Sequence, residues 1–253
     1  MAFDVAADAY DRFMGRYSTL LAPELLAAVG PEPGDRALDV GCGPGVLTRH
    51  LVELLGADHV AAADPSPPFV AAARERLPGV DVRQAPAEQL PFDDDSFDVV
   101  LAQLVVPFMS DAVAGLREMA RVARPGAPVA ATAWDHASGG SGPLSPFWRV
   151  VTEFDPGAYD ESGLAGQRSG DLVAIFREAG LADVRQLALT VHLPHATFEE
   201  WWEPYTWGVG PAGDYVASLD DAGRERLAAT ARRLLGDGPI TISGTAWCAV
   251  GRA

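Results

Sequence analysis

A short glycine-rich loop is the part of this chain whose residue types and spacing point most directly to chemistry. The loop Gly41–Gly45 separates a predicted buried strand, residues 36–40, from a predicted helix, residues 46–55. Open parallel sheets bind nucleotides at such strand-to-helix turns. A dinucleotide fingerprint requires a small residue where Val46 stands, so the spacing does not fit that class of ligand. Asp39, two residues before the first glycine, disfavours a pyrophosphate and favours a cationic ligand.

A second carboxylate lies at the end of the next predicted strand. Asp64 follows Asp39 by 25 residues. An acid at this place can accept hydrogen bonds from both hydroxyls of a ribose, whereas it would repel a 2′-phosphate. A nucleoside that carries cationic groups and no phosphate suits both carboxylates, and S-adenosylmethionine, with its ammonium and sulfonium, is such a ligand. The alternative is that both acids only cap helices or lie in loops.

These residues and a second motif carry a resemblance to a known family. The segments concerned are Ala37–Gly45, Asp64 and Ala87–Val100. Over about residues 35–133 the chain resembles the class I S-adenosylmethionine-dependent methyltransferases, and within them the type 11 methyltransferase domain, similar to ubiquinone and menaquinone biosynthesis methyltransferases. The resemblance implies an α/β fold with a doubly wound, mostly parallel seven-stranded Rossmann-like sheet and an antiparallel last strand. It also implies S-adenosylmethionine as cofactor, with S-adenosylhomocysteine as product.

Carried over by position, the resemblance assigns residues to each part of the cofactor. Those expected at the methionine end are Asp39, Gly41, Cys42, Gly43 and Gln103, together with Tyr10 or Arg16 of the N-terminal segment. Those expected at the nucleoside are Asp64, Pro65 and Ser66 for the ribose, and Ala87 and Glu88 for the adenine. The family often has an Asp just before the Ala-Glu pair, but here Pro86 offers neither a polar side chain nor an N–H. Adenine recognition would then depend on the Ala87 N–H, on apolar packing or on Glu88.

A further motif, Ser66–Phe69, resembles the Pro-Pro-aromatic signature of methyltransferases that act on amino nitrogens of bases and of glutamine. In that resemblance the motif follows the fourth strand, whereas here it follows the second predicted strand. Proline is favoured in the first turn of a helix. We therefore interpret the tetrapeptide as the N-terminus of a helix over residues 67–77, without a catalytic role.

Aromatic side chains are the candidates for the wall of an acceptor pocket at the carboxyl ends of the strands. The candidates are Phe108, Trp134, Phe147, Trp148, Trp201, Trp202, Tyr205 and Trp207. As a set they favour a partly apolar small-molecule acceptor. The alternative is that they form a packed core, because aromatic side chains fill space wherever it is left.

A general base would help if the acceptor is a hydroxyl. His136 is the candidate, because it follows the fifth predicted strand and stands beside Asp135, which could orient it. His192 and His195 are further candidates, and a solvated loop histidine is the alternative for each. No His/Cys set has the spacing of metal ligands, so we expect no catalytic metal.

Strands and helices alternate through the first half of the chain, which predicts a parallel sheet with helices on both faces. The remaining predicted strands are 59–64, 80–84, 97–102, 128–133, 184–193 and 240–250. The remaining predicted helices are 6–29, an Asp111-capped helix to 123, 146–154, a Ser169-capped helix to 179, and helices within 197–236. We expect a single methyltransferase domain whose core is formed by about residues 30–134, 169–193 and 238–253. A lid is expected from residues 1–29, 135–168 and 194–237.

Composition limits the function further. The chain of 253 residues has a net charge of −16, and all 19 of its basic residues are arginine. The absence of lysine excludes Schiff-base chemistry and a Walker-type phosphate loop. The acidic surface disfavours nucleic-acid partners, so Arg12, Arg16 and Arg149 are the basic residues of interest for any anionic group. No disulfide framework, signal region or membrane-spanning run is evident. We expect a cytoplasmic monomer or homodimer without a membrane partner.

Three functions remain open from the sequence. The favoured one is transfer of a methyl group from S-adenosylmethionine to an oxygen or nitrogen of a small-molecule acceptor. The second is an NAD(P)-dependent reductase on a similar core, against which Val46 argues. The third is a protein that binds S-adenosylmethionine without turning it over. The identity of the acceptor is not encoded in any motif of the chain.

Overall fold

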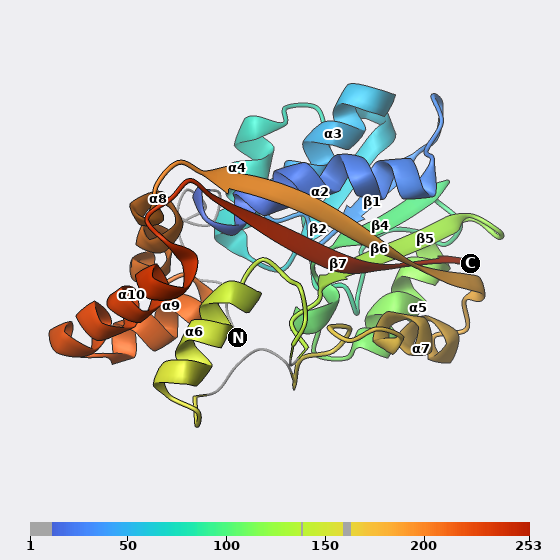
Figure 1. The fold of residues 1–253 in the computed structure, drawn as a ribbon. Coiled ribbons are helices and arrows are strands. Elements are labelled where there is room, and N and C mark those ends of the chain that lie inside the picture. Colours follow the sequence, from blue (N-terminus) through green and yellow to red (C-terminus); the bar gives the residue numbers. More distant parts are fainter. Residues whose placement is uncertain (1–11, 138, 159–162) are drawn as a thin grey trace.

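A seven-stranded sheet forms the centre of the protein (Figure 1). A computed structural model describes residues 12–137, 139–158 and 163–253. The strands are β1 Ala37–Val40, β2 Val60–Asp64, β3 Asp81–Gln84, β4 Val99–Gln103, β5 Pro128–Trp134, β6 Ala182–His195 and β7 Ile240–Arg252. Their order is β3-β2-β1-β4-β5-β7-β6, and only β7 runs antiparallel to its neighbours. The expected mostly parallel sheet with an antiparallel last strand is confirmed.

Helices cover both faces of this sheet. Figure 1 shows α2 (Met14–Val29), α3 (Val46–Leu55) and α4 (Pro67–Arg76) on one face. Helices α5 (Ala112–Val122) and α7 (Asp171–Glu178) lie on the other. The central strands are short and apolar because both of their faces are covered; all residues of β1 and β2 are buried. This burial fixes the carboxyl ends of β1, β2, β4 and β5 in one row.

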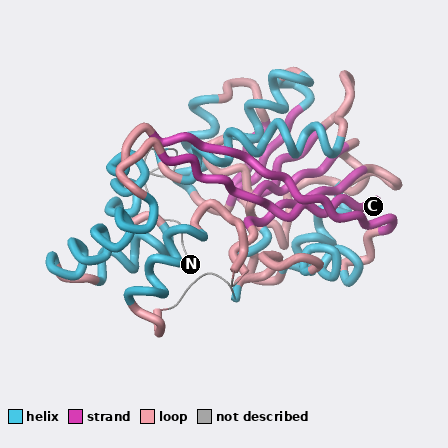
Figure 2. The backbone as a smooth tube through the Cα atoms, in the orientation of Figure 1, coloured by secondary structure: helices cyan, strands magenta, loops and turns pink. Residues whose placement is uncertain are grey.

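The remaining helices gather beyond one end of the sheet, on the left of Figure 1. They are α6 (Ser145–Phe154), α8 (Phe198–Trp202), the short 3₁₀ helix η4 (Glu203–Trp207), α9 (Gly210–Ser218) and α10 (Asp221–Leu235), which we call the helical end. Strands β6 and β7 are long, and Figure 2 shows them running from the sheet to this end. Helices from two distant parts of the chain are thereby brought together beside the strand ends.

The sequence predicted most elements within two residues of their observed bounds. The Asp111 cap is confirmed, because its side chain accepts a hydrogen bond from the Ala114 N–H at 2.9 Å. The Ser169 cap is wrong: Gly170 is the N-cap of α7, with a φ of 92° that favours glycine. Ser169 instead accepts a hydrogen bond from the Gln186 side chain at 3.0 Å.

The expected division into core and lid stays a prediction, but the position of α2 bears on it. This helix packs on β6 and α3, and it contributes Tyr17, Leu21 and Leu25 to the larger hydrophobic core. Most of its length therefore covers the sheet. In the part of the chain that the structure describes, no helix is long and apolar enough to cross a membrane.

Candidate active site

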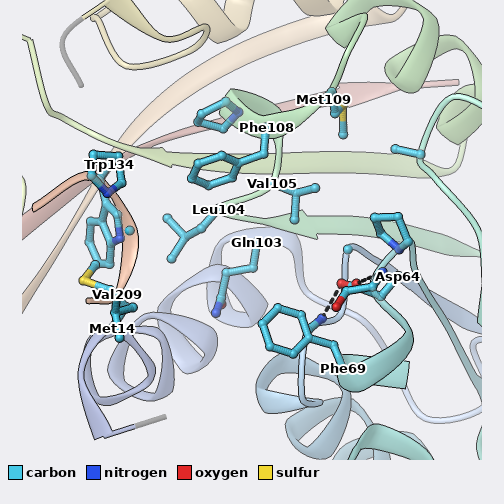
Figure 3. A pocket seen from close by; sticks show the side chains of 18 of the residues that line it. Met14, Asp64, Phe69, Gln103, Leu104, Val105, Phe108, Met109, Trp134 and Val209 are labelled. Atoms are coloured by element: carbon cyan, nitrogen blue, oxygen red, sulfur yellow. Dashed lines mark hydrogen bonds between the residues drawn. The ribbon is translucent and has the colours of Figure 1, made fainter. Parts of the chain in front are cut away.

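One large pocket, of about 490 Å³, opens at the carboxyl ends of the parallel strands. Figure 3 shows Asp64 and Phe69 at one end of it, Trp134 and Val209 at the other, and Leu104 between them. We call these the loop end and the tryptophan end. Ligands bind at this edge in open α/β sheets, because the strand order reverses there and neighbouring loops separate.

The glycine loop forms part of the floor at the loop end. The Gly41 and Cys42 N–H groups donate to the Ala63 carbonyl at 2.7 and 3.0 Å, which ties the loop to the end of β2. Gly41 has a φ of 70°, and a Cβ there would overlap the Val105 side chain. Gly43 has a φ of 54°, and a Cβ there would meet nothing within 4 Å. Glycine at 41 therefore permits a close approach, whereas Gly43 borders open space in the pocket.

Asp64 holds the turn and also lines the pocket. Its Oδ2 accepts a hydrogen bond from the Gly43 N–H at 2.8 Å, and its Oδ1 accepts one from the Ser66 N–H at 2.9 Å. The residue is only 6% exposed, and burial raises the pKa of its carboxyl against the effect of these two bonds. Each oxygen still has a lone pair, so the carboxylate can accept further hydrogen bonds from a diol. Pro65 and Ser66 line the pocket beside it.

Asp39 lies beneath the loop rather than on the pocket wall. It is 1% exposed, and its Oδ2 accepts a hydrogen bond from the Thr48 hydroxyl at 2.6 Å. Burial raises the pKa of Asp39 to about 7, and the nearby charge of Asp64 adds to the rise. Cys42 is also buried away from the pocket, and burial raises the pKa of its thiol. Direct contact of either residue with a ligand was expected, but both support the loop from below.

Ala87 and Glu88 line the loop end on the far side of Asp64. The Glu88 Oε1 accepts hydrogen bonds from the Ser110 N–H at 2.6 Å and the Asp111 N–H at 3.1 Å. The carboxylate thus fixes the segment that precedes α5. Its availability to an adenine is restricted accordingly, and apolar packing against Ala87 and Met109 provides the alternative wall.

The segment after β4 forms the middle of the pocket. Gln103 lines the wall, and its Nε2 donates to the Ser18 carbonyl of α2 at 3.1 Å. Leu104 has a φ of 66°, in the left-handed region that a branched side chain seldom adopts. The Thr132 carbonyl and hydroxyl hold it there by accepting from the Leu104 N–H at 3.0 and 3.1 Å. Such strain, about 1–3 kcal/mol, persists where the surroundings enforce it and is frequent at functional sites.

The tryptophan end receives three residues that the sequence singled out. Phe108, Trp134 and His136 all line the pocket. Phe108 is 42% exposed, whereas Trp134 and His136 are 6% and 7% exposed. The neighbouring Asp135 anchors the following turn, because its Oδ2 accepts hydrogen bonds from the Ser141 N–H and hydroxyl at 3.0 and 3.1 Å. His136 therefore reaches the expected place, and its role as a base stays a prediction.

Six of the eight aromatic wall candidates are absent from the described lining of the large pocket, namely Phe147, Trp148, Trp201, Trp202, Tyr205 and Trp207. Trp148, Trp201 and Tyr205 are buried in the helical end. The Tyr205 ring stacks on the Phe147 ring with 4.4 Å between the ring centroids and 7° between the ring planes. The centroids of the Trp201 and Tyr205 rings lie 5.0 Å apart. These rings pack α6 against α8 and η4. Their position is therefore set by packing within the helical end, and the expectation that they face an acceptor is corrected. Phe13 links this aromatic cluster to the pocket by an edge contact with Tyr205 at 4.9 Å.

The predicted basic residue of the N-terminal segment is also engaged elsewhere. Arg16 donates to Glu200 at 2.8 Å and does not line the large pocket, which corrects its expected place at the cofactor. Tyr10 lies outside the described residues. The other two candidate histidines are absent from the described lining of the large pocket. His192 forms a hydrogen bond with the Ser243 hydroxyl at 2.8 Å, and the His195 Nε2 lies 3.3 Å from the Tyr17 hydroxyl.

Several lining residues were missed by the sequence analysis. Phe69 lies in the Ser-Pro-Pro-Phe motif, where the helix N-terminus was correctly predicted but the ring was given no role. Gln167 comes from the connection before α7, and the segment Val209–Ala212 is the N-cap and first turn of α9. No sequence signal marks them, because their position depends on long-range packing. Among the described residues, no group of His, Cys, Asp or Glu is placed to hold a metal ion.

Comparisons with known proteins bear on the loop end most directly. Residues 38–131 match the family described as methyltransferase domain. The demethylmenaquinone methyltransferase of Beutenbergia cavernae is 42% identical over 101 residues, which cover 40% of this chain and 41% of the relative. The chain spans about half the length of the curated relatives it matches. The similarity thus concerns the strands and loops that build the loop end.

Solved structures share the fold over most of the chain. Haemonchus contortus phosphoethanolamine N-methyltransferase 2, in complex with phosphomonomethylethanolamine and S-adenosylhomocysteine, has a TM-score of 0.57 at 17% identity, covering 98% of this chain and 60% of that one. The [4+2]-cyclase SpnF has a TM-score of 0.57 at 21% identity, covering 92% and 81%. At these identities the likeness supports the fold alone, and the fold occurs in proteins named for different reactions.

The family match begins within β1 and ends within β5, and so includes the glycine loop, Asp64 and the Ala87–Glu88 pair. The resemblance that these motifs indicated is confirmed for this part of the chain. Residues 38–131 therefore match the methyltransferase domain family, and the remaining segments build the helical end beside the matched part.

Proposed function

We propose that the protein is an S-adenosylmethionine-dependent methyltransferase that acts on an oxygen or nitrogen of a small molecule. The observation that carries the proposal is the carboxylate of Asp64, which lines the pocket beside a glycine loop with the open position at Gly43. A ribose diol can donate to such a carboxylate. No phosphate is required by this arrangement, and a carboxylate so close would repel one.

The residues at the loop end fit a cationic nucleoside. Asp64 would accept from the ribose hydroxyls, and the Gly43 position leaves space for the methionine portion. Apolar walls from Ala87, Met109 and Phe69 suit a flat base. Asp39, beneath the loop, adds negative potential from a distance rather than through contact.

The reaction needs alignment more than it needs a catalytic group. The bound cofactor would supply a methyl group already activated by the sulfonium. In an in-line displacement the bond from the acceptor atom to the methyl carbon forms while the carbon–sulfur bond breaks, and the electron pair remains on sulfur. The chain contributes orientation, and it excludes water through the mostly apolar wall between Leu104 and Val209.

A hydroxyl acceptor must also lose its proton, and His136 is the residue we propose to receive it at an imidazole nitrogen. Its support is position: it lies at the tryptophan end and is buried to 7% exposure. Replacing it tests the role, because His136→Ala should lower kcat by about 10²–10⁴-fold if the base is needed. Full turnover by the variant would remove His136 from the mechanism.

Two other functions compete with this proposal. A reductase that uses NAD(P) would need the loop to accommodate a pyrophosphate, but Val46 stands where a dinucleotide fingerprint requires a small residue, and Asp39 beneath the loop disfavours the phosphates. A protein that binds S-adenosylmethionine without turning it over is the other alternative, and the fold does not separate it from an enzyme, since the similarly folded SpnF is named a [4+2]-cyclase. The acceptors named for similar proteins differ from one another, so none is carried over to this chain.

Isothermal titration calorimetry with S-adenosylhomocysteine and with NADH distinguishes the first two functions. We expect one molecule of S-adenosylhomocysteine to bind per chain and NADH not to bind. Binding of NADH alone would overturn the proposal. A screen of small-molecule acceptors with S-adenosylmethionine, read by mass spectrometry as a gain of one methyl group, then separates an enzyme from a protein that only binds the cofactor.

A further inference from the structure

The charge of the pocket wall limits the class of acceptor. Among the described residues that line it, the only Asp or Glu side chains are Asp64 and Glu88, both at the loop end, and none is arginine. The segments outside the described ranges, residues 1–11, 138 and 159–162, contain no arginine, and the chain has no lysine. A phosphate or carboxylate on the acceptor would therefore find no guanidinium or ammonium side chain to compensate its loss of water.

Arginines that stand close in sequence to lining residues do not line the wall themselves. Arg12 stacks over the Trp207 ring at 4.4 Å, and Arg16 pairs with Glu200 at 2.8 Å. Arg149, which is exposed on α6, and Arg168, which follows Gln167, are absent from the described lining. An anionic acceptor could recruit Arg12 or Arg16 only by breaking these contacts.

Uncharged polar groups lie at the tryptophan end instead. The Trp134 Nε1 and the Gln167 Oε1 are both almost inaccessible to water and have no hydrogen-bond partner among the described residues. The side chains are 6% and 2% exposed, and both residues belong to the pocket lining. A buried donor or acceptor without a partner costs about 1–3 kcal/mol. Here one donor and one acceptor lack a partner on residues that line this end of the pocket.

Gln167 follows a glycine that packs against the end of β5. Gly166 has a φ of 81°, and a Cβ there would lie 3.4 Å from the Cβ of Ala133, the residue before Trp134. The same Cβ would press on Leu172 of α7 at 2.8 Å. Glycine at 166 thus lets the 163–170 connection pass against the end of β5, and Gln167 and Trp134 both belong to the pocket lining.

We propose that the pocket selects an uncharged, largely apolar acceptor that carries oxygen or nitrogen groups, and that Trp134 and Gln167 bind those groups. Trp134 would donate its Nε1–H, and Gln167 would accept at Oε1. The apolar remainder of the acceptor would pack on Leu144 and the Val209–Ala212 segment, which also line this end. This inference rests on the proposed function, because it assigns to the acceptor the part of the pocket that the cofactor leaves.

Three probes that share one ring system test the inference on the protein saturated with S-adenosylhomocysteine. They are 2,3-dihydroxynaphthalene, which is neutral with two oxygens, 3-hydroxy-2-naphthoate, which replaces one hydroxyl by a carboxylate, and naphthalene, which has no polar group. Calorimetry should give the diol the highest affinity. We expect the naphthoate to bind at least about 10-fold more weakly, because its charge is desolvated without a partner.

Variants then identify the groups responsible. Trp134→Phe and Gln167→Leu should each weaken binding of the diol by about 3- to 10-fold, the range of one neutral hydrogen bond. Neither variant should change the affinity for naphthalene by more than about twofold. A variant that had lost the shape of the pocket or the stability of the protein would bind naphthalene more weakly as well. Trp247→Phe is the matched control, because its Nε1 is also buried without a partner but the residue does not line the pocket.

The outcomes separate this inference from the proposed function. Three results, obtained with protein that binds S-adenosylhomocysteine, would overturn the inference about the acceptor. They are equal or tighter binding of the naphthoate than of the diol, no binding of the diol, and unchanged diol affinity in both variants. Failure of the unaltered protein to bind S-adenosylhomocysteine would instead contradict the proposed function.

Discussion

The two ends of the pocket are built in different ways. The floor of the loop end is formed by backbone groups and the Asp64 carboxylate within a short stretch of chain, where direct hydrogen bonds tie Gly41 and Gly43 to the end of β2. The tryptophan end is assembled from side chains of Trp134, Gln167 and the Val209–Ala212 segment, which are far apart in sequence.

The difference teaches how specificity is divided in this fold. A site made of backbone turns tolerates few changes, because each glycine or carboxylate satisfies several groups at once. A site made of side chains on separate connections can change one residue at a time without disturbing the sheet. We therefore expect the loop end to hold the common cofactor and the tryptophan end to define the acceptor.

The largest expected effect concerns the aromatic cluster, which supports the tryptophan end without lining it. Tyr205→Ala should lower the free energy of unfolding by about 3–5 kcal/mol, because it leaves a cavity beside Phe147 and Phe13. Tyr205→Phe keeps the stacked ring and serves as the control. Urea denaturation measures both, and equal stability of the two variants would show that the ring does not hold the helical end.

Two glycines of the loop provide the next comparison. Gly41→Ala should weaken binding of S-adenosylhomocysteine and lower stability by about 1–3 kcal/mol, because its Cβ would overlap Val105 and its φ is positive. Gly43→Ala should lower stability by only about 1 kcal/mol, because its Cβ meets open space. Thermal unfolding and calorimetry check both. A larger loss of stability in Gly43→Ala would contradict the packing described for the loop.

Asp64 tests the carboxylate at the loop end. Asp64→Asn should weaken binding of S-adenosylhomocysteine by about 10- to 100-fold, since an amide offers one acceptor oxygen where the carboxylate offers two. Asp81→Asn, at an exposed position paired with Arg83, is the control and should leave the affinity unchanged. Unaltered affinity in Asp64→Asn would mean that the ribose is held by other groups.

The last prediction concerns the pH dependence that Asp39 adds to stability. Burial raises its pKa to about 7, from an ordinary value of 3.8. The folded state thus holds this proton more tightly than the unfolded chain, and the stabilisation is lost as pH rises from about 4 to 7. Asp39→Asn removes the dependence, so it should gain stability relative to the unaltered protein between pH 5 and pH 8. A constant difference across that range would contradict the assignment.

The sequence predicted more of the loop end than of the tryptophan end. Asp39, Gly41 and Asp64 were recognisable because strand, loop and helix follow one another within one unit of the chain. Even there, the sequence did not show that Asp39 faces Thr48 rather than the pocket, because the direction of a buried side chain depends on its neighbours.

At the other end, aromatic residue type was a poor guide. Trp134 lines the pocket whereas Trp201 and Tyr205 fill the helical end, although all are large and apolar. Gln167 carries no pattern at all, and its place depends on the close passage of Gly166 along β5. Such positions follow from contacts between connections that periodicity does not encode.

The separation of the two ends is the central claim, and one measurement tests it most directly. S-adenosylhomocysteine is titrated by calorimetry into the unaltered protein, the Asp64→Asn variant and a variant that combines Trp134→Phe with Gln167→Leu. We predict an affinity within about threefold of the unaltered protein for the double variant and a loss of about 10- to 100-fold for Asp64→Asn. Loss of binding in the double variant with retention in Asp64→Asn would contradict the account.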